Sequence, residues 1–218
     1  GLNEDNAVTK LAEAVAEIGR TRWPIRLTST TRALLEGLSA LSGRSVDDPD
    51  ALASAAGPAE AFLRSSFRTT TNPTALTAGY KHNVIPERAE ALIDVRVIPG
   101  TEDDVLAELQ QIVGDEIIIE TVVRDIGMET PFEGELVEAM VASIGRHDPG
   151  VPVIPYLLGA GTDNQALAYL GITGYGFAPL KLPADLDFTG MFHGVDERVP
   201  VDSLVFGQRV LTDLLRTY

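Results

Sequence analysis

Residues 74–98, TALTAGYKHNVIPERAEALIDVRVI, decide the fold more clearly than any other stretch of the chain. Two runs within it, Thr74–Tyr80 and Glu90–Ile98, are strand-like, and the turn-forming Asn83–Pro86 separates them. Pro99 and Gly100 then close the second run. The sequence therefore predicts a β-hairpin at this place.

Helices are predicted on both sides of the hairpin. Before it, Asn3–Gly19 has apolar residues at helical spacing, and Asn3 or Asp5 can cap its start. After it, Asp103–Val113 has the same spacing, and Glu116–Val123 is a further β-rich run. This order of elements indicates a two-layer α+β sandwich of the ferredoxin-like kind, with helices on one face of an antiparallel sheet.

The rest of the chain alternates helices with short apolar runs. Leu34–Leu41 has helical spacing, and Ser45–Ala56 is a polar loop or a capped helix start. Later come a helix Gly134–Ile144, an apolar run Val151–Leu158, a helix Asp163–Leu170, an apolar run Ile172–Phe177 and a terminal helix Asp202–Leu215. This alternation is typical of an α/β layer with a buried, largely parallel sheet. We place the boundary between the two parts so that residues 1–124 form one domain and residues 125–218 belong to another.

Composition narrows the possible partners. The formal net charge of −15, with the 17 Lys and Arg residues scattered along the chain, argues against nucleic acid. No run approaches the roughly 18–20 apolar residues that a membrane helix requires, so no membrane partner is expected. The chain has no cysteine, so a metal here must be held by histidines and carboxylates, and the composition is compatible with the cytoplasm.

The glycine-rich segment Gly159–Asn164 lies between an apolar run and a predicted helix. Glycine lets the backbone approach a ligand closely, and amides at a helix N-terminus attract an anion. A site for a carboxylate or a phosphate is one interpretation. The alternative is that Thr162 or Asp163 caps the following helix.

The second polar segment of interest is residues 191–200, MFHGVDERVP, before the terminal helix. Its single histidine, His193, is a candidate metal ligand. A lone histidine in a loop is also often a surface or packing residue.

Taken together, these segments resemble the M20 metallopeptidases. Residues 193–200, HGVDERVP, resemble the ending of that family, and Gly161-Thr162-Asp163 resembles its glycine-threonine-aspartate segment. The hairpin motifs Asn83–Pro86 and Ala91–Arg96 resemble its paired lid strands. The resemblance implies that residues 1–124 are a lid and dimerisation domain without its first strand, and that residues 125–218 end a zinc-exopeptidase-like catalytic domain.

The resemblance also implies roles for individual residues. His193 matches the family's last zinc ligand, in a site that holds a pair of zinc ions. Gly161 and Thr162 match the loop that meets the carboxylate side of the substrate. Asn83 and Arg96 match lid residues that point at the substrate, and a guanidinium suits a carboxylate because its planar fork can bind both oxygens.

Simpler interpretations of these residues stay open. Arg96 can form a surface ion pair with Asp94 or Glu90, and Asn83 can simply make the hairpin turn. Residues 196–198 fit an ion-pair and helix-entry cluster better than a catalytic group. His82 and His147 match no family ligand, and we expect both to face solvent.

Most of the family's catalytic groups have no counterpart in the sequence. There is no His-x-Asp and no Glu-Glu pair, and the histidines number 3. We therefore expect a fragment that is inactive by itself. The intact protein is expected to use zinc and a glutamate to hydrolyse an amide bond of a dipeptide, a short peptide or an N-acyl amino acid. A homodimer through the lid is implied, and the alternative is a non-catalytic dimerisation or carboxylate-binding module.

Overall fold

The computed structural model describes residues 5–218. Its elements are α1 (Ala7–Arg20), α2 (Ser29–Ser42), α3 (Pro49–Ala55), η1 (Gly57–Ala59), α4 (Glu60–Ser65), β1 (Thr70–Ala78), β2 (Ala89–Arg96), α5 (Glu102–Val113), α6 (Glu135–His147), α7 (Asn164–Tyr169), η2 (Thr189–Met191) and α8 (Val201–Thr217). Contacts divide the chain into two compact units. Unit 1 runs up to Arg26 and includes Arg68–Met128, whereas unit 2 contains Leu27–Phe67 and Glu129–Tyr218.

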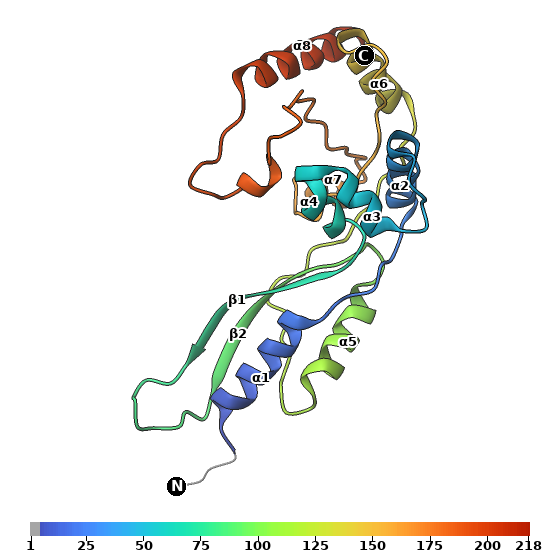
Figure 1. The fold of residues 1–218 in the computed structure, drawn as a ribbon. Coiled ribbons are helices and arrows are strands. Elements are labelled where there is room, and N and C mark those ends of the chain that lie inside the picture. Colours follow the sequence, from blue (N-terminus) through green and yellow to red (C-terminus); the bar gives the residue numbers. More distant parts are fainter. Residues whose placement is uncertain (1–4) are drawn as a thin grey trace. The chain divides into compact units, whose positions relative to one another are not determined.

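The predicted hairpin is confirmed and forms the centre of unit 1. Strands β1 and β2 pair antiparallel, from Thr70 opposite Arg96 to Ala78 opposite Ala89. The register shifts between Pro73 and Ala75, because proline cannot donate a hydrogen bond to the ladder and is tolerated at a bulge. Helix α1 packs on both strands of the hairpin and on α5 (Figure 1).

Side chains alternate between the two faces of β2, and those on one face pack into the core of unit 1. The side chains of Ile93 and Val95 pack against a buried cluster from α1, α5 and the segment between α1 and α2. That cluster consists of Ile18, Trp23, Val105 and Leu109. The indole Nε1 of Trp23 donates to the hydroxyl of Thr71 at 3.1 Å, which satisfies the polar end of this buried ring.

Two details of the prediction for unit 1 are wrong. The run Glu116–Val123 forms no strand, and Ile118 and Val122 are exposed. High β-propensity does not make a strand without a neighbouring strand to pair with. Helix α1 is capped by Asn6, whose side chain accepts from the Val8 N–H at 3.0 Å, and not by Asp5; Asn3 lies outside the described residues.

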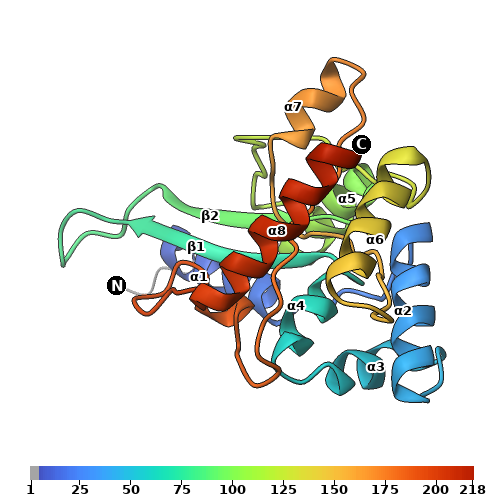
Figure 2. The ribbon, with the colours of Figure 1, turned by 90° about the horizontal axis from the view of Figure 1, so that it is seen from above.

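In unit 2, the segment 27–67 folds into the short helices α2, α3 and α4 (Figure 2). A capping box between Thr28 and Thr31 starts α2, and the Asp48 side chain caps α3. The helices enclose a core in which Leu52 and Phe67 are fully buried. Burial of their apolar side chains against one another therefore stabilises these helices, because helices of this length would be only marginally stable in isolation.

The remaining part of unit 2 contains the packed pair α6 and α8. The predicted buried parallel sheet is absent from residues 5–218, because the runs 151–158 and 172–177 form no strand. Both runs still bury apolar side chains against helices: Ile154 packs on the core of α2 to α4, and Phe177 packs on the core of α6 and α8. Val151, Leu158 and Ile172 in the same runs are exposed, so apolar content predicted the burial of only part of each run.

The break between units after Met128 lies close to the predicted boundary after residue 124. Residues 27–67 pack with unit 2, although the sequence placed them in the first domain. The assignment of functional domains stays a prediction. Within residues 5–218 no helix is both long enough and apolar enough to cross a membrane.

Candidate functional site

The predicted site residues are distributed over both units. Asn83 and Arg96 belong to unit 1, whereas Gly161, Thr162 and His193 belong to unit 2.

In unit 1, Arg96 is the last residue of β2. Its Nε donates to Oδ2 of Asp94 at 2.9 Å, and the two side chains are 47% and 40% exposed. An exposed ion pair of this kind contributes only about 0–1 kcal/mol to stability. Asn83 is exposed in the connection between β1 and β2, in a turn that the Val84 N–H closes by donating to the Lys81 carbonyl at 3.3 Å.

In unit 2, Gly161 and Thr162 are exposed in the loop that precedes α7. The backbone N–H of Gln165 donates to the Thr162 carbonyl at 3.0 Å, so the loop leads directly into the helix. Asp163 occupies the N-cap position, but its side chain makes no capping hydrogen bond. The helix-cap alternative therefore gains no support from the Asp163 side chain.

His193 has an unusual backbone. Its φ is 61°, and it is the non-glycine residue with positive φ among residues 5–218. Left-handed backbone at a non-glycine residue costs about 1–3 kcal/mol, and such strain gathers at functional sites. The loop holds this conformation locally: the His193 N–H donates to Oε2 of Glu197 at 3.3 Å, and the Gly194 N–H donates to the Met191 carbonyl at 2.9 Å.

A hydrogen bond connects the two ends of the segment that carries His193. The hydroxyl of Ser203, at the start of α8, donates to the Lys181 carbonyl at 2.6 Å. The ammonium of Lys181 in turn pairs with Asp148 at 2.8 Å. These contacts fix both ends of the segment between Lys181 and Ser203.

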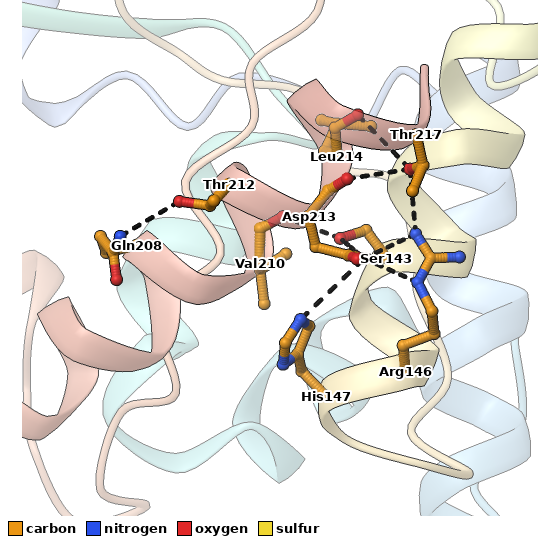
Figure 3. A network of polar contacts seen from close by, with 9 residues as sticks. All are labelled: Ser143, Arg146, His147, Gln208, Val210, Thr212, Asp213, Leu214 and Thr217. Carbon is orange, nitrogen blue, oxygen red and sulfur yellow. Dashed lines mark hydrogen bonds and ion pairs between the residues drawn. The ribbon is translucent and has the colours of Figure 1, made fainter.

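Helix α8 is held by a polar network with α6 (Figure 3). The carboxylate of Asp213 accepts from the Arg146 guanidinium at 2.6 Å and from the Ser143 hydroxyl at 3.0 Å. His147 Nε2 lies 3.9 Å from the same carboxylate. Hydrogen bonds from Arg146, reinforced by that from Ser143, hold the pKa of Asp213 below its ordinary value.

A second carboxylate caps α2. Glu129 accepts from the Thr30 N–H at 2.6 Å and from the Ser29 hydroxyl at 2.7 Å. Partial burial opposes ionisation of Glu129, but these hydrogen bonds outweigh it, so the pKa of Glu129 is lowered. Negative charge is also favoured at a helix N-terminus. Glu129 therefore joins the segment 27–67 to the rest of unit 2.

The described residues do not assemble a metal site by themselves. No group of three or more His, Cys, Asp or Glu side chains among residues 5–218 is placed to hold a metal ion. A metal ion in a protein needs about three or four protein ligands. His193 could supply one imidazole, and a complete metal site would need donors from outside the described residues.

Sequence reasoning missed the polar residues that hold the segment before α7, helix α2 and helix α8 in place. Ser66, Glu129 and Asp213 each make a hydrogen bond to a residue far away in the sequence. Their neighbours in the sequence carry no motif. Only the folded contacts identify them.

The chain was compared with known proteins. Residues 2–119 match the family described as "Peptidase dimerisation domain" of the M20 type. The chain is 30% identical over 139 residues to "Probable carboxypeptidase S-like 2" of Dictyostelium discoideum, a match covering 62% of this chain and 26% of that protein. It is 32% identical over 148 residues to "N-fatty-acyl-amino acid synthase/hydrolase PM20D1" of Mus musculus, covering 62% and 28% respectively.

Other similarities point the same way. "Aminoacylase-1" of Homo sapiens is 26% identical over 158 residues, covering 70% of this chain and 38% of that protein. The fold is similar to that of the M20 family metallo-carboxypeptidase Sso-CP2 from Sulfolobus solfataricus, with a TM-score of 0.58 at 18% identity. That match covers 97% of this chain and 52% of the solved chain. The chain thus spans well under half of the length of these curated relatives and about half of the length of the solved chain.

Proposed function

Because this chain belongs to the M20 peptidase family, to which the match over residues 2–119 assigns it, we propose that it is part of an enzyme that hydrolyses amide bonds. The match to the dimerisation domain is the observation that carries the proposal. The substrate class is a dipeptide, a short peptide or an N-acyl amino acid with a free carboxylate. The names of two relatives, an N-fatty-acyl-amino acid hydrolase and an aminoacylase, favour the N-acyl amino acids.

In this proposal the chain binds the carboxylate end of the substrate. Arg96 offers a planar guanidinium, and its ion pair with Asp94 uses only Nε. Asn83 offers an amide on the same unit. Gly161 and Thr162 offer backbone N–H groups and a hydroxyl in an exposed loop.

His193 is proposed as a metal ligand, with zinc as the metal. Its strained backbone supports a functional role, because the loop maintains a conformation that costs free energy. The other zinc ligands and the general base are proposed to come from segments outside this chain. The isolated chain is accordingly proposed to be inactive.

The dimerisation-domain match supports assembly as a homodimer through the lid. Nucleic acid and membranes are not proposed as partners, in keeping with the net charge of −15. The cytoplasm is the proposed location.

The proposal is tested by comparing the full-length gene product with this chain. Metal content is measured by elemental analysis, and hydrolysis is measured on a panel of dipeptides and N-acyl amino acids. We expect the full-length protein to bind zinc and to cleave members of the panel, and the 218-residue chain to do neither.

The second candidate function is a non-catalytic module that dimerises and binds a small carboxylate. The exposed glycine-rich loop at Gly161 supports it. A full-length product that binds N-acyl amino acids without metal and without cleavage would favour this candidate over the hydrolase.

A further inference from the structure

Helix α4 lies next to both loops of unit 2 that carry proposed site residues. Together with η1, it contacts η2, the short helix directly before His193. At its C-terminal end it borders the segment that leads to Gly161 and Thr162. The helix itself belongs to residues 27–67, where no sequence motif points to the site.

Two contacts join the end of α4 to this segment, and Ser65 lies near its glycines. The hydroxyl of Ser66 donates to the Leu157 carbonyl at 2.7 Å, and Ser66 is only 2% exposed. The ring of Phe62 meets that of Tyr156 edge to face, with centroids 5.4 Å apart. A Cβ added at Gly159 would lie 3.7 Å from the Ser65 hydroxyl oxygen, in ordinary van der Waals contact.

These contacts matter because the run 151–158 forms no strand. Without a ladder of backbone hydrogen bonds, its position depends on side-chain contacts. The partly buried Leu157 carbonyl would lose this partner if Ser66 lost its hydroxyl, and the loss of the hydrogen bond would cost free energy. The glycines that follow supply no side chain that could restore the position.

We propose that Ser66 is a positioning residue for the loop 158–163, and that Phe62 assists it from the preceding turn of α4. Because α4 also contacts η2, the same helix sets the loop relative to His193. The inference rests on the proposed function for its catalytic consequence. The positioning of the loop itself does not depend on any activity.

The first readout is limited proteolysis of the full-length protein. Ser66→Ala and Phe62→Leu should each speed proteolytic cleavage within residues 158–164 by about tenfold, because each removes one contact that holds this segment. The matched control is Ser143→Ala, which removes a hydroxyl that is equally buried and donates to the Val210 carbonyl at 2.8 Å. That control should speed cleavage within α6 and α8 and leave the rate of cleavage within residues 158–164 unchanged.

The second readout is kinetic and uses the full-length protein. Ser66→Ala and Phe62→Leu should raise KM for an N-acyl amino acid about three- to tenfold and change kcat less than twofold, since the binding loop is displaced. Ser143→Ala should leave KM unchanged. The proposal is overturned if neither variant affects residues 158–164 more than Ser143→Ala does. If wild-type full-length protein cleaves none of its proposed substrates, the proposed hydrolase function fails, while the limited-proteolysis experiment still decides the role of Ser66.

Discussion

Arg96 donates from Nε to Oδ2 of Asp94 at 2.9 Å, two residues back along strand β2. Residues two apart on a strand lie on the same face, so the ion pair forms without distortion of the backbone. The surface ion pair that the sequence left open for Arg96 is therefore present. It leaves the proposed role of the arginine compatible with the structure, because the bond uses only one of its nitrogens.

A substitution of Arg96 separates the two roles. In the full-length protein, Arg96→Ala should raise KM for carboxylate substrates about 10- to 100-fold, since a hydrogen bond between charged groups is lost. The matched control is Arg88→Ala, because Arg88 forms the same kind of ion pair, with Glu90, at a spacing of two residues. Equal, small effects of both substitutions on KM would reduce Arg96 to a surface ion-pair partner.

The network around Asp213 should make stability depend on pH. The folded state lowers the pKa of Asp213 from 3.8, so its stabilising effect is present above that value and is lost as pH falls through the folded pKa. Asp213→Asn should thus lower the melting temperature at pH 7, and the difference from wild type should shrink as pH falls below about 4. Thermal denaturation followed by circular dichroism measures this.

The control for Asp213 is Asp185→Asn, which makes the same change of charge at an exposed position. It should leave the melting temperature nearly unchanged at both pH values. A constant difference between Asp213→Asn and wild type down to pH 3 would mean that the charge of Asp213 does not hold α8.

Glu129 should stabilise unit 2 through the first turn of α2. Glu129→Ala removes the acceptor for Thr30 and Ser29 and should cost about 1–2 kcal/mol in the free energy of unfolding. Urea denaturation measures this cost, with Glu133→Gln, at an exposed glutamate, as the control. A loss no larger than that of the control would show that the cap contributes nothing.

Local patterns predicted the local structure well. The hairpin, α1, α5, α6 and α8 follow from alternation, helical spacing and turn residues, which act within a few residues of one another. Strand pairing depends on partners, so the β-rich run 116–123 and the apolar runs 151–158 and 172–177 were predicted as strands although they form none here.

Candidate site residues could be predicted from the sequence only where they lie in a segment that resembles a known motif. His193 and Gly161 stand in recognisable segments, which is why they were predicted as site residues, and their roles stay predictions. The bond from Ser66 to Leu157 depends on packing between segments that are distant in the sequence. No pattern in the neighbouring sequence carries that information.

The most direct test of the central claim is the metal content and activity of His193→Asn in the full-length protein. Asparagine tolerates left-handed backbone, so the loop at φ 61° should be retained while the imidazole is lost. With His147→Gln as the control, we predict that His193→Asn alone loses bound zinc and at least about a hundredfold in hydrolysis of N-acyl amino acids. Wild-type zinc content and wild-type activity in His193→Asn would contradict the account.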